Sequence, residues 1–99
     1  MANLILQGQL VVGSNIVYTA GDITLCQVIA IKYYNSAAYD IELRKYKSST
    51  ASTVTFYNLS LAAGDSVSDN FSYILERNDH LEIISSVAGT DYYINILQV

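Results

Sequence analysis

The sequence predicts an all-β fold: a single-domain antiparallel β-sandwich of jelly-roll-like type, with seven to eight strands. First, the 99 residues include nine tyrosines and no proline, and aromatic and branched side chains suit the pleated surface of a sheet. Second, short apolar runs alternate with turn residues, which is typical of sandwiches and disfavours a βαβ arrangement. Third, hydrophobic residues make up 52% of the chain, enough for one packed core, so residues 1–99 are expected to form one domain.

One turn pattern occurs three times along the chain. In each copy an apolar residue and two spacers precede a Gly or Asn, then an Asp, and a new apolar run follows. Gly and Asn enter the left-handed region of backbone space most cheaply, and the following Asp can accept hydrogen bonds from nearby backbone amides. We therefore predict that the chain reverses at three pairs of structural turn residues: Gly21 and Asp22, Gly64 and Asp65, and Asn78 and Asp79.

The apolar runs between these turns give the expected strands. Residues 1–13 are expected to form an N-terminal arm or an edge strand, because two short apolar runs are separated by a glycine. Residues 24–34 form the longest apolar segment, which fits a central strand covered on both faces; a helix is the competing assignment, disfavoured by the branched residues and flanking turns. Residues 39–46 alternate with period two, and residues 47–52 are expected to form an exposed loop. The remaining expected strands are residues 15–19, 53–61, 71–75, 81–86 and 92–99.

Charge and hydropathy argue against two classes of partner. The net charge of −4 disfavours binding to nucleic acid, and no apolar run approaches the roughly 20 residues of a membrane-spanning helix. The charges are also unevenly distributed, with four of the five bases between Lys32 and Lys47 and six of the nine acids between Asp65 and Asp91. Two interpretations stay open: oppositely charged patches that meet between subunits, or two solvated faces of one sandwich.

No catalytic, cofactor-binding or metal-binding residues are predicted. The single histidine, His80, has acidic neighbours, but no nucleophile motif accompanies it, as general base catalysis would require. Four acids could in principle supply oxygen ligands to calcium, yet the chain has no twelve-residue calcium loop, and backbone bonding accounts for aspartates in turns. These four are Asp65, Asp69, Glu76 and Asp79.

Self-association is the expected source of additional stability. A domain of this size gains a modest margin from its own core, and small folds often add disulfides, metals or oligomerisation. The single cysteine, Cys26, lies in an apolar run and is expected to be a buried thiol. Tyrosines in the middle of the chain are candidates for an interface between subunits, although core packing and stacking on sugars or on single-stranded nucleic acid are alternatives. These candidates are Tyr33, Tyr34, Tyr39, Tyr46 and Tyr57.

The order of these features forms a frame over residues 16–99. A strand ends in Val17-Tyr18-Thr19, Gly21 follows, and a long apolar strand closes on Asn35-Ser36. An alternating strand, the turns at residues 59–65 and 75–81 and a terminal strand complete the frame. In this order the chain resembles a group of small bacteriophage virion proteins with a jelly-roll or sandwich fold. The resemblance implies structural proteins that coat capsids, build head fibres or decorate tails, without enzymatic activity and usually as symmetric oligomers.

The function expected from this resemblance is that of a capsid decoration (cement) subunit, made in the host cytoplasm and located in the virion. Its expected partners are further copies of itself, for example in a trimer, and other virion proteins such as the major capsid protein. A head-fibre or tail accessory subunit is the alternative within the same class. A small carbohydrate-binding sandwich that uses Tyr33 or Tyr46 is the alternative from another class.

Overall fold

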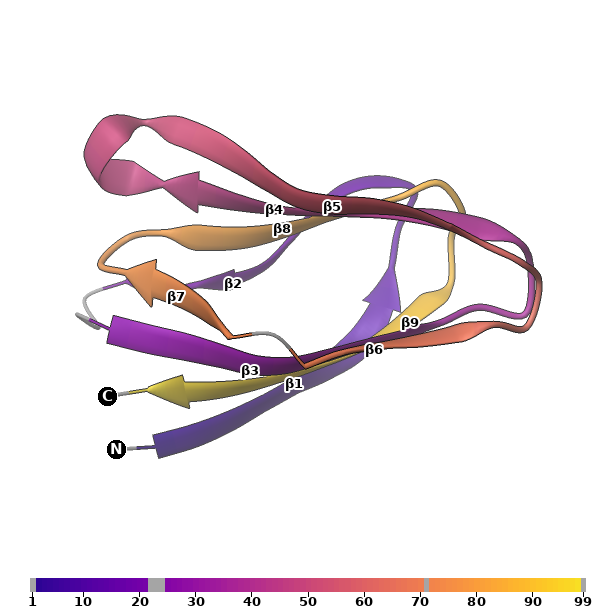
Figure 1. Ribbon diagram of the computed structural model, residues 1–99, viewed down its shortest axis with the longest axis horizontal. Helices are drawn as coiled ribbons and strands as arrows, with labels where there is room; N and C mark the ends of the chain where they lie inside the picture. The colour runs from indigo at the N-terminus through magenta and orange to yellow at the C-terminus, as the bar shows by residue number, and fades with distance from the viewer. Residues whose placement is uncertain (1, 22–24, 71, 99) are drawn as a thin grey trace.

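The structure is a computed structural model that describes residues 2–21, 25–70 and 72–98. These residues form two antiparallel sheets that face each other, as Figure 1 shows. A short 3-10 helix, η1 (Ser48–Thr50), joins two of the strands. The strands are β1 (Ala2–Leu10), β2 (Gly13–Thr19), β3 (Leu25–Tyr34), β4 (Tyr39–Lys47), β5 (Ser52–Leu61), β6 (Ser66–Asp69), β7 (Tyr73–Glu76), β8 (His80–Ser85) and β9 (Thr90–Gln98).

The pairing of the strands is nested. The first strand pairs with the last, β2 with β8, β3 with β6 and β7, and β4 with β5. Two further pairings, β3 with β9 and β4 with β8, join these hairpins into sheet A (β1-β9-β3-β6, with β7 also on β3) and sheet B (β2-β8-β4-β5). The two sheets form an antiparallel β-sandwich, and the predicted all-β sandwich fold is confirmed.

The described residues hold nine strands, against the seven to eight expected, because Ser66–Asp69, where no strand was expected, forms β6. β6 pairs with residues 31–34 of β3, and β7 pairs with residues 25–28 of the same strand. The two short strands therefore follow one another along a single edge of sheet A. The expected strand at residues 71–75 is shifted in the structure to Tyr73–Glu76, and Phe71 lies outside the described residues.

Strand β1 forms the opposite edge of sheet A, and it runs unbroken through Gly8. Gly8 lies directly across from Tyr92 on β9, and a side chain added at Gly8 would come within 3.3 Å of the Tyr92 hydroxyl oxygen. The glycine thus makes room for a tyrosine ring that covers it, a recognised way to support glycine in an edge strand. Residues 2–10 are therefore an edge strand ordered by β9.

The longest apolar segment, expected to be covered on both faces, is instead a strand with a β-bulge and one exposed face. Cys26 and Val28 point into the core, the register against β9 shifts between Val28 and Ala30, and from there Ile31 and Tyr33 point inward. The extra residue lengthens the apolar run and reverses the alternation. The outer face of β3 is not covered, because Lys32 and Tyr34 are exposed to solvent.

The core between the sheets is formed by inward-facing side chains from both layers. Ile41 and Leu43 of β4 are fully buried, and so is the thiol of Cys26, as the sequence predicts. The Cys26 sulfur lies 3.3 Å from the Tyr18 hydroxyl, so this cysteine is held within the packed interior. Other fully buried residues include Val28, Ile31, Leu75, Leu81, Ile83, Ile94 and Ile96.

The connections between strands gather at the two ends of the sandwich (Figure 1). At one end the Gly64 amide donates to the Asn35 carbonyl at 3.0 Å, which ties the β5–β6 connection to the β3–β4 connection. At the other end the Ala20 amide donates to the Asp79 carbonyl at 2.9 Å, and the Asn78 amide donates to the Gly21 carbonyl at 2.8 Å. Backbone bonds between distant turns therefore hold both ends of the sheets together.

Candidate functional site

The turn residues occupy backbone conformations that glycine and asparagine adopt at low cost. Gly21, Gly64 and Asn78 have φ angles of +61°, +80° and +63°, all in the left-handed region. Gly64 joins β5 to β6, and Asn78 joins β7 to β8. Asp22 lies outside the described residues.

The two remaining turn aspartates differ in what they do. Asp79 is 1% exposed, and its carboxylate accepts hydrogen bonds from the backbone amides of Ser48 and Glu76, both at 2.9 Å. The Lys45 ammonium lies 3.7 Å from the same carboxylate. By contrast, Asp65 is exposed, and its carbonyl oxygen accepts a bond from the Tyr39 hydroxyl at 2.7 Å. Only the Asp79 side chain thus links separate segments of the chain.

The five candidate tyrosines do not form one surface. Tyr33 and Tyr39 are each 2% exposed and belong to the core, so they are not available to a partner at the surface. The bulge in β3 explains Tyr33, because it turns that residue inward and its neighbour Tyr34 outward, where Tyr34 is 43% exposed. Tyr46 is half-buried and stacks on His80, with ring centroids 4.7 Å apart, and Tyr57 is half-buried at the open side of the sandwich.

Tyrosines and an aspartate form a polar cluster between the two sheets. The Tyr33 and Tyr57 hydroxyls lie 2.7 Å apart, and the Tyr73 hydroxyl donates to the Asp69 carboxylate at 2.7 Å. Asp69 is 8% exposed, and after burial its carboxylate also contributes to the raised pKa of the Tyr57 hydroxyl. Burial, above all, raises the pKa of the Tyr33, Tyr57 and Tyr73 hydroxyls, which therefore stay protonated and neutral.

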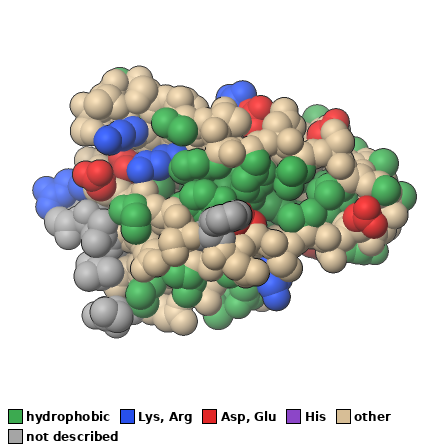
Figure 2. Space-filling model, in the orientation of Figure 1, with side chains coloured by type: hydrophobic (Ala, Val, Ile, Leu, Met, Phe, Trp, Pro, Cys, Tyr) green, Lys and Arg blue, Asp and Glu red, His purple; other side chains and the backbone are tan. Residues whose placement is uncertain are grey.

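Apolar side chains fill the open side of the sandwich between β5 and β6–β7. Figure 2 shows hydrophobic side chains gathered across the middle of this face. Phe56 and Tyr73 pack there with ring centroids 4.5 Å apart, and Leu61 and Val67 are half-buried against the core. A hollow of about 240 Å³ opens beside them, lined in part by Tyr57 and Val67. This seam is closed by side chains and not by backbone pairing between the sheets.

The opposite edge carries the most exposed aliphatic side chains. Seven large hydrophobic residues are exposed in the described part of the chain, and four of them lie on β1, β2 and the connection between these strands. Their exposed fractions are 50% for Ile5, 62% for both Val11 and Val12, and 61% for Ile16. Because β1 is the edge of sheet A and β2 the edge of sheet B, these residues define one edge of the sandwich, here called the β1–β2 edge.

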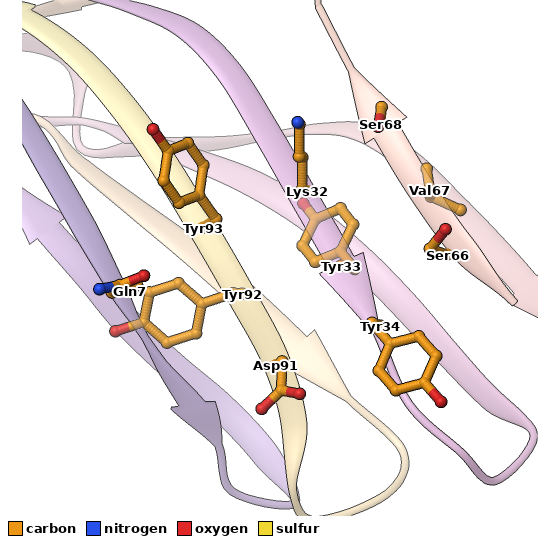
Figure 3. Close-up of a pocket in the computed structure, with 10 residues that line it drawn as sticks. All are labelled: Gln7, Lys32, Tyr33, Tyr34, Ser66, Val67, Ser68, Asp91, Tyr92 and Tyr93. Atoms are coloured by element: carbon orange, nitrogen blue, oxygen red, sulfur yellow. The ribbon is translucent and has the colours of Figure 1, made fainter. Parts of the chain in front are cut away.

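The outer face of sheet A presents tyrosines among small polar residues, as Figure 3 shows. The registers place side chains in two parallel rows: Gln7, Tyr93, Lys32 and Ser68 in one, and Gln9, Asp91, Tyr34 and Ser66 in the other. A hollow of about 430 Å³ lies over these rows. Tyr34 is among the residues predicted from the sequence, whereas Tyr93, Asp91 and Gln7 are not, because no local pattern marks residues that meet only through pairing of β1, β9 and β3.

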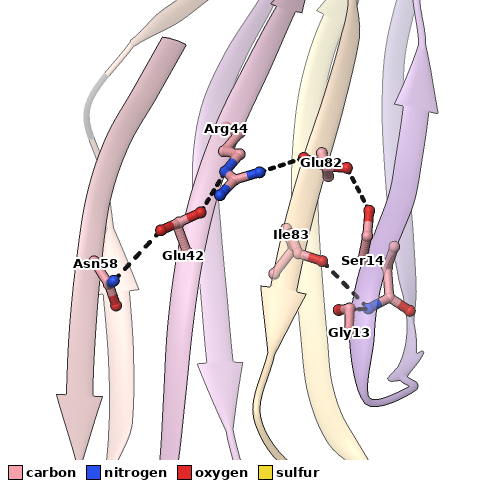
Figure 4. A network of polar contacts seen from close by, with 8 residues as sticks. Gly13, Ser14, Glu42, Arg44, Asn58, Glu82 and Ile83 are labelled. Carbon is pink, nitrogen blue, oxygen red and sulfur yellow. Dashed lines mark hydrogen bonds and ion pairs between the residues drawn. The ribbon is translucent and has the colours of Figure 1, made fainter. Parts of the chain in front are cut away.

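The outer face of sheet B is a ladder of charged and polar groups (Figure 4). Arg44 of β4 forms an ion pair with Glu42 and lies 3.7 Å from Glu82 of β8. The ladder is extended to β5 by Asn58, which donates to Glu42, and to β2 by Ser14, which donates to Glu82. The basic and acidic segments of the sequence thus meet within one subunit at Arg44–Glu82, as they do at Lys45–Asp79.

No described group of three or more His, Cys, Asp or Glu residues is placed to hold a metal ion. Within the described ranges, no helix is long and apolar enough to cross a membrane.

Solved structures with the same fold include chains from viral shells and from a pilus. A chain of Bacillus endospore appendages, disulfide-linked pili, has a TM-score of 0.52 and 15% identity over 96% of this chain and 81% of its own. A pentameric capsid protein from metagenomic phage sequences has a TM-score of 0.54 and 12% identity, over 96% of this chain and 61% of its own. A chain of the T13 particle of infectious bursal disease virus has a TM-score of 0.55 and 11% identity, over 97% of this chain and 31% of its own.

At these identities the similarity shows a shared β-sandwich fold. The chain spans less than two thirds of the phage capsid protein and of the bursal disease virus chain. No protein-family model and no curated protein matches the sequence.

Proposed function

We propose that this protein is a non-enzymatic structural subunit of a phage virion, and that it acts as a capsid decoration (cement) protein through protein–protein contacts. The observation that carries the proposal is the β1–β2 edge, where Ile5, Val11, Val12 and Ile16 are each at least 50% exposed. Exposed apolar side chains that gather at one edge of a domain favour an interaction site there.

The backbone of the same edge favours assembly as well. β1 and β2 each pair with a neighbour on one side, so their other sides present backbone donors and acceptors to a further strand. An apolar edge with free backbone groups suits contacts with a second copy of the chain and with a capsid surface. The fold shared with a phage capsid protein and with a pilus supports a role in assembly.

A homo-oligomer, for example a trimer, is the proposed state, and the major capsid protein is the proposed second partner. The position in the virion distinguishes a decoration protein from the alternative, a head-fibre or tail accessory subunit. Immunogold labelling of purified virions tests this: label over the capsid shell is expected, whereas label confined to fibres or the tail favours the alternative. Virions that lack the chain would contradict both.

Self-association is tested by light scattering coupled to size exclusion. The unmodified chain is expected to be an oligomer, and Val12→Lys and Ile16→Lys are expected to release monomers, because a charge within an apolar contact is costly to desolvate. The matched control is Val54→Lys, since Val54 is also exposed but lies on β5 at the opposite edge. A monomeric unmodified chain, or dissociation by the control alone, contradicts the assignment of this edge.

A further inference from the structure

We propose that the outer face of sheet A binds a neutral oligosaccharide in a groove that crosses β1, β9, β3 and β6. This site goes beyond the assembly role, and none of the four exposed aliphatic residues of the β1–β2 edge lines it. Four tyrosines line it, and of these Tyr34 and Tyr93 stand in the two outward-facing rows. They replace the buried Tyr33 and the His80-stacked Tyr46 as the residues proposed to contact a sugar.

The groove is a product of strand register. Gln7 faces Tyr93, Tyr93 faces Lys32, and Lys32 faces Ser68 across successive strands, so these four side chains lie on one face. Directly paired residues on one face of a sheet lie close enough for their side chains to act together. Short serines on β6 beside longer tyrosines leave space above the sheet, and this space is visible in Figure 3.

The size of the groove fits several sugar units. The hollow over both rows measures about 430 Å³, within the range of about 300–1,000 Å³ for small-molecule sites. A second hollow of about 290 Å³ adjoins it, is lined by the same Gln7 and Asp91, and adds Gln9 of β1. Together they run from the edge strand β1 to β6, across the sheet. A linear chain of sugars therefore fits better than a single sugar.

The chemistry of the lining matches a carbohydrate. A sugar has C–H faces that pack on the electron-rich faces of aromatic rings, and a rim of hydroxyls that both donate and accept hydrogen bonds. Tyr34 and Tyr93 supply the rings. Asp91 supplies an acceptor, the Lys32 ammonium a donor, and the amide of Gln7 both. Five of the ten lining residues are polar or charged and four are tyrosines, so the groove offers a sugar both stacking surface and hydrogen bonds.

Other ligand classes fit less well. The exposed aliphatic residues of the β1–β2 edge do not line the groove, and half of its lining residues are polar or charged, so it is more polar than the centre of a protein interface. Asp91 repels phosphate and acidic sugars, and Lys32 lies 6.0 Å from the centre of the Tyr93 ring, where the ring already interacts with its charge. A neutral sugar chain avoids both restrictions.

The test uses the whole protein and three probes: the linear hexasaccharides of α-1,4-linked glucose, β-1,4-linked glucose and β-1,4-linked N-acetylglucosamine. Binding is measured by calorimetry and mapped by amide chemical shifts. At least one probe is expected to bind at millimolar concentration and to shift amides of residues 32–34 and 91–93. Tyr34→Ala and Asp91→Ala are each expected to weaken binding about tenfold or more, through loss of stacking and of a hydrogen bond to a charged acceptor.

Controls separate the site from its surroundings. Tyr34→Phe keeps the ring and is expected to retain most of the affinity, and Tyr46→Ala on sheet B is expected to change nothing. Both alanine variants in the groove replace exposed residues, and their thermal midpoints verify folding. The proposal is overturned if none of the three probes binds, if the shifted amides lie elsewhere, or if Tyr46→Ala abolishes binding and Tyr34→Ala does not.

Discussion

The Tyr33 hydroxyl of β3 lies 2.7 Å from the Tyr57 hydroxyl of β5, and this hydrogen bond joins sheet A to sheet B. The two rings meet edge to face, with centroids 6.5 Å apart and an interplanar angle of 80°. The pair lies at the open side of the sandwich, where β5 and β6–β7 are not joined by backbone pairing. On this side of the sandwich, contacts between side chains therefore hold the two sheets together, as backbone hydrogen bonds hold the strands within each sheet.

The two hydroxyls are expected to be energetically coupled. Tyr33→Phe removes one partner and should lower the free energy of unfolding by about 1–2 kcal/mol, because a largely buried hydroxyl loses its hydrogen bond. Tyr57→Phe should have a similar or larger effect, since Tyr57 also contacts Asp69. In urea denaturation the double variant should lose clearly less than the sum of the two single changes. Tyr46→Phe is the matched control, with an expected change within about 0.5 kcal/mol, and strict additivity would contradict the coupling.

The same burial predicts a loss of stability in alkali. Burial raises the pKa of five tyrosines in the folded chain: Tyr18, Tyr33, Tyr39, Tyr57 and Tyr73. In the unfolded chain these hydroxyls lose their protons near pH 10, about the usual tyrosine pKa, while the folded chain still holds them. Their contribution to stability is thus complete below about pH 10 and falls as the pH rises further.

Two measurements check this. Ionisation of these tyrosines should leave the urea midpoint unchanged up to about pH 10 and should lower it at higher pH. The fall should be smaller for Tyr33→Phe. The absorbance of tyrosinate should rise for some tyrosines only together with the loss of the circular dichroism of the sheet. Complete ionisation of all nine tyrosines in a chain that is still folded would contradict the prediction.

The fold was predictable from the sequence because its signals are local. Alternation places Ile41 and Leu43 in the core, and the glycine-rich turns mark where strands reverse. The bulge at Ile29 has no such signal, since an extra isoleucine in an apolar strand looks like any other apolar residue. That single insertion decides that Tyr33 is buried and Tyr34 exposed, and so determines which tyrosine can contact a ligand.

The candidate groove could not be predicted for a different reason. Gln7, Lys32 and Tyr93 become neighbours only because β9 pairs with both β1 and β3, and these strands are separated by most of the chain. Composition and periodicity identify strands and their faces but do not specify strand order. The residues of such a face are known only once the nested pairing is known.

Substitution of Gly64 by alanine should destabilise the left-handed turn at this position. Gly64 has a φ of +80°, and a side chain there would meet no atom within 4 Å, so the cost is backbone strain without steric clash. Gly64→Ala should lower the free energy of unfolding by about 1–2 kcal/mol, whereas Gly64→Asn should cost less because asparagine tolerates this conformation. Urea denaturation measures both, and an unchanged stability for Gly64→Ala would contradict the strain.

The aspartates of the repeated turn pattern should differ in how much they contribute to stability. Asp79 is buried and accepts two backbone hydrogen bonds, from Ser48 and from Glu76, which join the β4–β5 connection to the β7–β8 turn. Asp79→Ala leaves both amides without this acceptor and should cost about 2–4 kcal/mol. Asp79→Asn should fall between, because it keeps one oxygen acceptor but loses the charge that lies 3.7 Å from Lys45.

Asp65→Ala is the matched control, since Asp65 holds the same position in the sequence pattern but its side chain is exposed. Its expected change is within about 0.5 kcal/mol, because the bond that it receives from Tyr39 ends on the backbone carbonyl, which the substitution keeps. Thermal and urea unfolding of the three variants check the ranking. Equal losses for Asp65→Ala and Asp79→Ala would contradict the prediction, because the two side chains would then contribute equally despite their different burial and bonding.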